Sequence, residues 1–301
     1  MKIFTIVIHV LPTELSELHR LLSDFKKSIH MLNNSMDTSN LKFNIFVTLN
    51  ISDKLMEFTD KSVFLLYYHE LYQEFNNYLS LNFNTSDDLN IAGTTAQKRY
   101  VIHNDDESDI FIFLDPDIYF PSDLLYYMVI SENIASNDTD MFVITPNTVK
   151  LWDDTWDCLV NNRYKHEEYG FHKTINPTEA YTQEIDNVNL SENTTFKFGC
   201  GWFTLYSKKF VKHIGIPESF GDYGSEDTYM MECAKMMRSH GINVKQYIID
   251  GVFIVEDYII RPKFNETLVK YNQNKSGAKT HNSPVFAEEL NIFFNKLNRN
   301  M

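Results

Sequence analysis

The chain has 301 residues, 43% hydrophobic and 23% charged, which is enough to build one large domain or two small ones around a core. Its 41 acidic and 27 basic side chains give a net charge of −14, which argues against a nucleic-acid partner because such proteins bind phosphates through lysine and arginine. No segment approaches the roughly 20 apolar residues of a membrane span. The three cysteines are far apart in the chain, which favours reduced thiols and a cytoplasmic location, with peripheral contact to a membrane left open.

The first hundred residues show strand and helix patterns in turn. Residues 3–10, IFTIVIHV, predict a strand, and a helix pattern follows, with Thr13 as its expected N-cap. The apolar face of that helix consists of Leu15, Leu18, Leu22, Phe25 and Ile29. Residues 42–49 predict a second strand, whereas the apolar run at 63–68 is followed by an ambiguous segment rich in Asn, Tyr and Leu.

The alternation continues through the middle of the chain. A helix pattern at 94–104 precedes the unbroken apolar run 110–114, which predicts a strand buried on both faces. A helix pattern then begins near residue 121, and a strand pattern follows at 140–146. This order predicts an α/β fold with a doubly wound, mostly parallel sheet and helices on both faces, in a single domain.

Two carboxylates, Asp115 and Asp117, come directly after the buried run. Ligands of doubly wound sheets bind beyond the carboxyl ends of the strands, and alternate residues of an extended segment point the same way. Two neighbouring carboxylates repel each other unless a cation lies between them, and Mg²⁺ or Mn²⁺ commonly uses such a pair together with substrate phosphates. The pair therefore predicts a divalent metal site that holds a diphosphate. The alternative is a simple turn, because Asp and Pro are common turn residues.

A second group of candidate residues lies between positions 198 and 242. Gly201 and Trp202 belong to a loop whose glycines permit close approach to a ligand. Further on, Glu226 and Asp227 stand at the start of a helix, where acidic side chains also have a purely structural role in capping. The expected apolar face of that helix is Met230, Ala234 and Met237, and Gly241 is expected to end it.

Residues 110–120 and 198–240 together resemble glycosyltransferases of the GT-A fold, in particular the family-2-like group. In that group an apolar strand ends in Asp-x-Asp, and a Gly-Gly-aromatic segment later precedes a Gly-x-Glu-Asp helix start. The resemblance implies that Asp115 and Asp117 bind Mn²⁺ or Mg²⁺ and the diphosphate of the donor. It also implies that Asp227 takes the proton of the acceptor hydroxyl, with Glu226 beside it.

The resemblance extends to other positions. It implies that Gly201 and Trp202 pack against the donor sugar and the acceptor, and that either Lys98 or Arg99 approaches the donor. His281 matches the region where some members add a histidine to the metal, although a lone loop histidine is more often solvated. Trp152, Asp153 and Trp156 suit the acceptor side, with core packing as the alternative.

The implied function is a metal-dependent, inverting glycosyltransferase that uses a nucleotide sugar, with a UDP-sugar as the first expectation, and a glycan or other hydroxyl acceptor. Residues 1–120 would bind the donor, residues 121–255 the acceptor, and residues 256–301 would form a C-terminal extension whose helix packs on the sheet, a membrane or another subunit. Three alternatives remain: a retaining transferase of the same fold, a nucleotidyltransferase, and a non-catalytic sugar or nucleotide binder. The segment after the first strand lacks the glycines of a phosphate loop, which counts against the nucleotidyltransferase.

Overall fold

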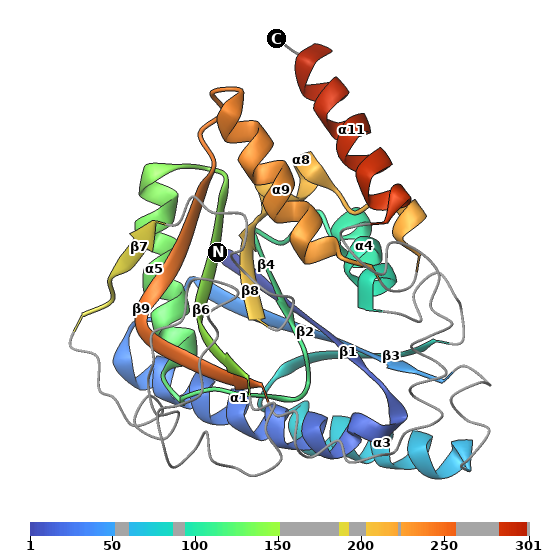
Figure 1. Ribbon diagram of the computed structural model, residues 1–301. Helices are drawn as coiled ribbons and strands as arrows, with labels where there is room; N and C mark the ends of the chain where they lie inside the picture. Colours follow the sequence, from blue (N-terminus) through green and yellow to red (C-terminus); the bar gives the residue numbers. More distant parts are fainter. Residues whose placement is uncertain are drawn as a thin grey trace.

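The computed structural model describes residues 1–51, 60–86, 94–150, 187–192, 203–221, 224–256 and 283–299. In this part of the chain a nine-stranded sheet has the order β3-β2-β1-β4-β8-β6-β9-β5, and β7 pairs with β9 (Figure 1). The strands are β1 Lys2–Val10, β2 Leu41–Asn50, β3 Ser80–Ser86, β4 Ile110–Leu114, β5 Ile118–Tyr119, β6 Phe142–Lys150, β7 Leu190–Glu192, β8 Phe203–Ser207 and β9 Lys245–Glu256. The helices are α1 Leu15–Ser35, α3 Lys61–Phe75, α4 Thr94–Asn104, α5 Leu124–Asp138, α8 Lys208–Ile214, α9 Glu226–Ser239 and α11 Pro284–Arg299, with short 3₁₀ turns at η1 Pro12–Glu14 and η3 Glu218–Phe220.

Most strands of the sheet run in one direction. β1 pairs in parallel with β2 and β4, and β2 pairs in parallel with β3. β8 is antiparallel to both of its neighbours, β4 and β6, so that β6 and its parallel partner β9 share the direction of β4. β5 and β7 are antiparallel to β9. The predicted α/β fold with a mostly parallel sheet is therefore confirmed.

Helices cover both faces of the sheet, as expected for a doubly wound fold (Figure 1). α1, α3 and α5 enclose one core cluster, and α4, α8, α9 and α11 enclose the other. β4 contributes to both clusters, because Ile110, Ile112 and Leu114 face the first while Phe111 and Phe113 face the second. The prediction that 110–114 is buried on both faces is thus confirmed.

The structure differs from the sequence prediction at the start of α1, and it assigns the segment after residue 60 that the sequence left ambiguous. α1 begins at Leu15 with Glu14 as its N-cap, after the η1 turn, so the expectation that Thr13 caps this helix is wrong. The Glu14 side chain accepts a hydrogen bond from the Leu11 amide at 2.9 Å, which stabilises the tighter turn before the helix. The apolar run 63–68 lies in α3, and the ambiguous segment after it contains the edge strand β3.

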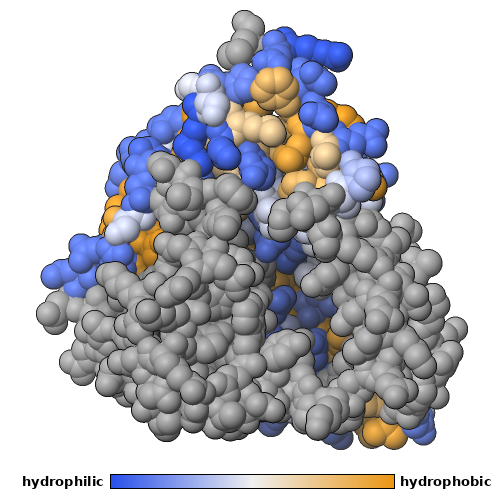
Figure 2. Space-filling model, viewed as in Figure 1, coloured by the Kyte–Doolittle hydropathy of each residue, from blue (hydrophilic) through white to orange (hydrophobic). Residues whose placement is uncertain are grey.

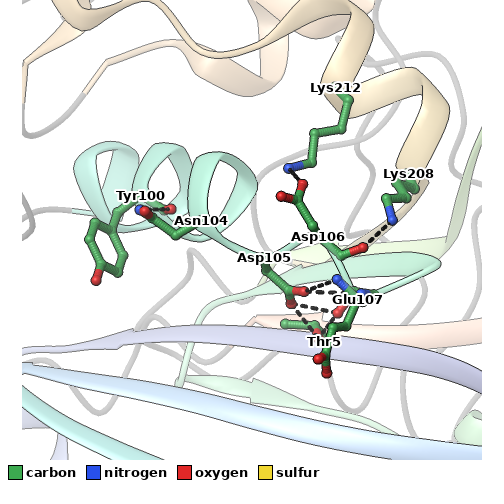
Figure 3. Close-up of polar contacts among 9 residues, drawn as sticks. Thr5, Tyr100, Asn104, Asp105, Asp106, Glu107, Lys208 and Lys212 are labelled. Carbon is green, nitrogen blue, oxygen red and sulfur yellow. Dashed lines mark hydrogen bonds and ion pairs between the residues drawn. The ribbon is translucent and has the colours of Figure 1, made fainter.

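Acidic residues fix the loop between α4 and β4 (Figure 3). This loop precedes β4, whereas Asp115 follows it, so the two lie at opposite ends of the strand. Asp105 accepts hydrogen bonds from the hydroxyls of Thr5 and Ser108. Burial alone would raise the pKa of Asp105, but these hydrogen bonds outweigh it and lower the pKa. The neighbouring Asp106 accepts from the Lys212 ammonium at 2.7 Å, which ties the loop to α8. These carboxylates therefore have structural partners.

The C-terminal helix α11 packs on α9 and η3. Phe286 stacks on Phe220 of η3 with ring centroids 6.0 Å apart, and Phe293 meets Tyr229 of α9 edge to face at 6.5 Å. Figure 2 shows apolar side chains gathered where α9 and α11 meet, near the top of the view. Among the described helices, none combines the length and apolar character needed to cross a membrane.

Candidate active site

The predicted metal-binding pair lies in the short turn between β4 and β5. Asp117 is 2% exposed and Asp115 is half-buried, and both follow the carboxyl end of the central strand β4. Downstream, β5 pairs with β9 through Ile118, so the chain is held on both sides of the turn. The structure therefore places the pair where doubly wound sheets bind their ligands.

A buried ion pair joins α4 to the first turn of α9. The Lys98 ammonium donates to Oε1 of Glu226 at 2.6 Å, and these residues are only 3% and 6% exposed. The Thr95 hydroxyl donates to Oε2 of Glu226 at 2.8 Å. Both oxygens of the Glu226 carboxylate are thus engaged by α4. Thr95 was not anticipated from the sequence, because its role depends on a partner 131 positions away.

Lys98 also links the two candidate motifs electrostatically. Burial alone would lower the pKa of Lys98, but attraction to Glu226, Asp115 and Asp227 outweighs it and raises the pKa above its ordinary value. Lys98 therefore remains a cation at neutral pH. Its charge acts on the turn after β4 and on the start of α9, which are more than a hundred residues apart in the chain.

Asp227 occupies a different environment from its neighbour Glu226. It is half-buried, and its Oδ1 accepts a hydrogen bond from the Thr228 amide at 2.7 Å. Its position in the first turn of α9 places its negative charge at the positive end of the helix dipole. The helix that carries it matches the sequence prediction, because Met230, Ala234 and Met237 are buried. Gly241, with a φ of 76°, follows its end.

The neighbouring cations Lys98 and Arg99 have different hydrogen-bond partners. The Arg99 guanidinium donates to the carbonyls of Pro217 at 2.8 Å and Gly221 at 3.2 Å, and so braces the loop before α9. Gly224 lies farther along this loop, where an added Cβ would come within 3.0 Å of the Phe220 side chain. Its amide donates to the Thr95 hydroxyl at 2.8 Å, which holds the loop against α4. Lys98 pairs directly with the candidate carboxylate Glu226, and attraction to Asp115 and Asp227 also raises its pKa.

Several predicted site residues lie outside the described part of the chain, and for them the expectations stand as predictions. These are Gly201 and Trp202 of the glycine loop, His281, and the acceptor-side candidates Trp152, Asp153 and Trp156.

The Asp115 and Asp117 carboxylates fit a hard divalent cation in the chemistry of their donor atoms. Within the described ranges, no group of three or more His, Cys, Asp or Glu side chains is suited to hold a metal. Mg²⁺ is nevertheless commonly bound by only one or two carboxylates of the protein, and substrate phosphates and water supply its other ligands. A pair of this kind would leave the remaining coordination positions of the cation to a phosphorylated ligand and water.

No protein-family model matches the sequence, and no curated protein matches it either. Among solved structures, the chain is similar to GalNAc-T7, solved with UDP, GalNAc and Mn²⁺, with a TM-score of 0.52 and 11% identity over 99% of this chain and 49% of that one. The chain thus spans about half the length of GalNAc-T7. The likeness shows the fold, and the protein has the GT-A fold of glycosyltransferases.

Two other solved structures show weaker likeness. Glucosyl-3-phosphoglycerate synthase from Mycobacterium tuberculosis gives a TM-score of 0.44 and 6% identity over 98% of this chain and 79% of that one. The 4-diphosphocytidyl-2C-methyl-D-erythritolsynthase from Anaerococcus prevotii gives a TM-score of 0.42 and 10% identity over 90% of this chain and 99% of that one. We base the fold assignment on GalNAc-T7.

Proposed function

We propose that the protein is a metal-dependent glycosyltransferase that transfers a sugar from a nucleotide sugar, a UDP-sugar in the first instance, to a hydroxyl group of a glycan or other acceptor. The observation that carries the proposal is the position of Lys98. Lys98 pairs with Glu226 at 2.6 Å, and attraction to Asp115 and Asp227 helps to raise its pKa, which supports assigning the two motifs that resemble the family to one site. The GT-A fold supports the proposal, and so does the presence of UDP and Mn²⁺ in the structure of GalNAc-T7, which shares this fold.

On the donor side, Asp115 and Asp117 would hold Mn²⁺ or Mg²⁺. When bound, the cation supplies neutralisation of the negative charge on the departing diphosphate. Lys98 adds a fixed positive charge on the same side, inside a nearly buried environment where electrostatic interactions are strong. We further propose that residues 1–120 bind the donor and residues 121–255 the acceptor, with His281 as an additional metal ligand.

On the acceptor side, Asp227 would act as the general base and Glu226 as a positioning residue. The acceptor oxygen forms a bond to the anomeric carbon, the bond from that carbon to the diphosphate oxygen breaks with its electron pair, and the hydroxyl proton passes to Asp227. Glu226 is unsuited to this step because Lys98 and Thr95 occupy both of its oxygens. One base together with one metal is the arrangement from which we expect inversion.

The test begins with the thermal unfolding of the protein in UDP-, GDP- and dTDP-sugars, each with and without Mn²⁺. A donor present at about 100 times its Kd stabilises the native state by about 2.7 kcal/mol, so a metal-dependent rise in Tm identifies it. Asp117→Asn should abolish this rise. Full metal-dependent stabilisation of the Asp117→Asn variant would show that the metal site is wrongly assigned.

Product analysis with the donor so identified then separates the alternatives. A sugar attached to a hydroxyl with inverted anomeric configuration, seen by NMR, supports the proposal. Retained configuration would indicate a retaining enzyme, and transfer of the nucleotidyl group a nucleotidyltransferase. Stable binding without turnover across a panel of glycan acceptors would indicate a non-catalytic binder.

A further inference from the structure

Arg20 of α1 contacts the backbone of the turn that carries Asp115 and Asp117. Its Nη1 donates to the carbonyl of Ile118 at 2.8 Å, and its Nη2 donates to the carbonyl of Pro116 at 3.1 Å. Its guanidinium carbon also lies 3.7 Å from the centre of the Tyr119 ring. One side chain thus contacts the turn both before and after Asp117.

These contacts restrict the backbone around Asp117. The two hydrogen-bonded peptide groups bracket Asp117 and Ile118, and a guanidinium presents its donors in a rigid planar fork. The distance between the two carbonyls is therefore set by the guanidinium. Stacking on Tyr119 holds the next residue as well, because a cation over an aromatic face is attracted to it. Asp117, which is 2% exposed, lies within the stretch of backbone that these contacts restrict.

Arg20 is itself held in place by α1. Its Nη1 lies 3.3 Å from Oδ2 of Asp24 one turn later, and the two side chains are 24% and 18% exposed. Lys27 pairs with the other oxygen of Asp24 at 3.0 Å, but its own side chain is 68% exposed. The helix is anchored by buried leucines on its apolar face, including Leu18 and Leu22. The turn is therefore connected to a rigid element of the core.

We propose that Arg20 is a positioning residue for the metal site, which holds the turn in the conformation that presents Asp115 and Asp117 to a divalent cation. This inference rests on the proposed function. Groups that orient metal ligands typically affect metal affinity by about 10- to 100-fold when they are replaced, although they never touch the metal. Arg20 would act in this way through the backbone, from the α1 side of the turn.

The experiment compares the Mn²⁺ affinity of purified wild type with those of Arg20→Met, Arg20→Lys and Lys27→Met, in the presence of saturating UDP. Free Mn²⁺ is measured by electron paramagnetic resonance, and circular dichroism in EDTA checks that each variant is folded. We expect Arg20→Met to bind Mn²⁺ about 10- to 100-fold more weakly. Lys27→Met, which loses a cation paired with the same Asp24, should bind like wild type. Arg20→Lys should fall between them, because lysine keeps the charge but lacks the fork.

An unchanged Mn²⁺ affinity in Arg20→Met would overturn the inference, and so would an equal loss in Lys27→Met. If Arg20→Met does not fold, Arg20→Lys decides: wild-type affinity refutes the inference, and an affinity reduced beyond that of Lys27→Met supports it. Failure of the wild type itself to bind Mn²⁺ with any of the three nucleotides UDP, GDP and dTDP would instead refute the proposed function, and the inference with it.

Discussion

Replacing Lys98 with methionine would remove the cation at the centre of the candidate site while keeping a side chain of similar length. Glu226 would keep the hydrogen bond from Thr95 but lose the ammonium 2.6 Å away, in a position where it is 6% exposed. Removing one partner of a buried ion pair typically costs about 3 to 5 kcal/mol, because the other charge stays buried without compensation. Since a native protein is stable by only about 5 to 15 kcal/mol, Lys98→Met should lose a large part of its unfolding free energy.

Urea denaturation followed by circular dichroism measures this loss. The control is Lys209→Met, which breaks the Lys209–Asp140 ion pair of 2.8 Å between side chains that are 58% and 74% exposed. Such surface pairs contribute at most about 1 kcal/mol. Adding Glu226→Gln to Lys98→Met should recover part of the stability, because it removes the buried charge that was left. A loss in Lys98→Met no larger than in Lys209→Met would refute the reasoning.

A second prediction for Lys98→Met concerns the pH dependence of its stability. The pKa of Lys98 in the folded protein is raised above the ordinary 10.5, so its stabilising contribution is fully present below that pH and is lost as the pH rises through the folded pKa. The difference in unfolding free energy between wild type and Lys98→Met should therefore be constant at neutral pH and shrink only in strongly alkaline solution. A difference that already shrinks near pH 8 would contradict the assignment.

The other predictions concern the base, the C-terminal helix and the loop before β4. Asp227→Asn should keep the donor affinity of the wild type and reduce kcat by roughly 100-fold or more in a transfer assay, as expected for loss of a general base; an unchanged kcat would exclude Asp227 from that role. Phe293→Ala, at a position that is 3% exposed, should lower the unfolding free energy by about 3 to 5 kcal/mol in urea, whereas Ile292→Ala, at 55% exposure, should change it by about 0.5 kcal/mol or less. The pKa of Asp105 is lowered from 3.8 in the folded protein, so its contribution to the free energy of unfolding is present above that pH and is lost as the pH falls through the folded pKa. The unfolding free energy of Asp105→Asn should therefore depend less on pH below about pH 4 than that of the wild type. Equal acid sensitivity in that variant and wild type would contradict this.

The elements that carry the site could be predicted from the sequence because their signals are local. The helix pattern at 94–104 corresponds to α4, and the unbroken apolar run 110–114 corresponds to β4. Burial on both faces requires apolar side chains at successive positions, and this requirement is visible in five residues. The third strand was not predictable in this way, because β3 is an edge strand with exposed asparagines and lacks such a run.

The sequence by itself determined the alternation of strand and helix from α4 to β6, the position of Asp115 and Asp117 after a central strand, and the acidic start of α9, since each depends on neighbours within a few residues. Only the tertiary structure decided which side chain meets which. In the folded protein Lys98 contacts Glu226, whereas Arg99 contacts the Pro217 carbonyl. Thr95 contacts the second oxygen of Glu226, and Arg20 contacts the Ile118 carbonyl next to the turn that carries Asp117. Each of these contacts joins positions about a hundred residues apart, and such distances are closed by packing of helices on the sheet, which no local pattern records.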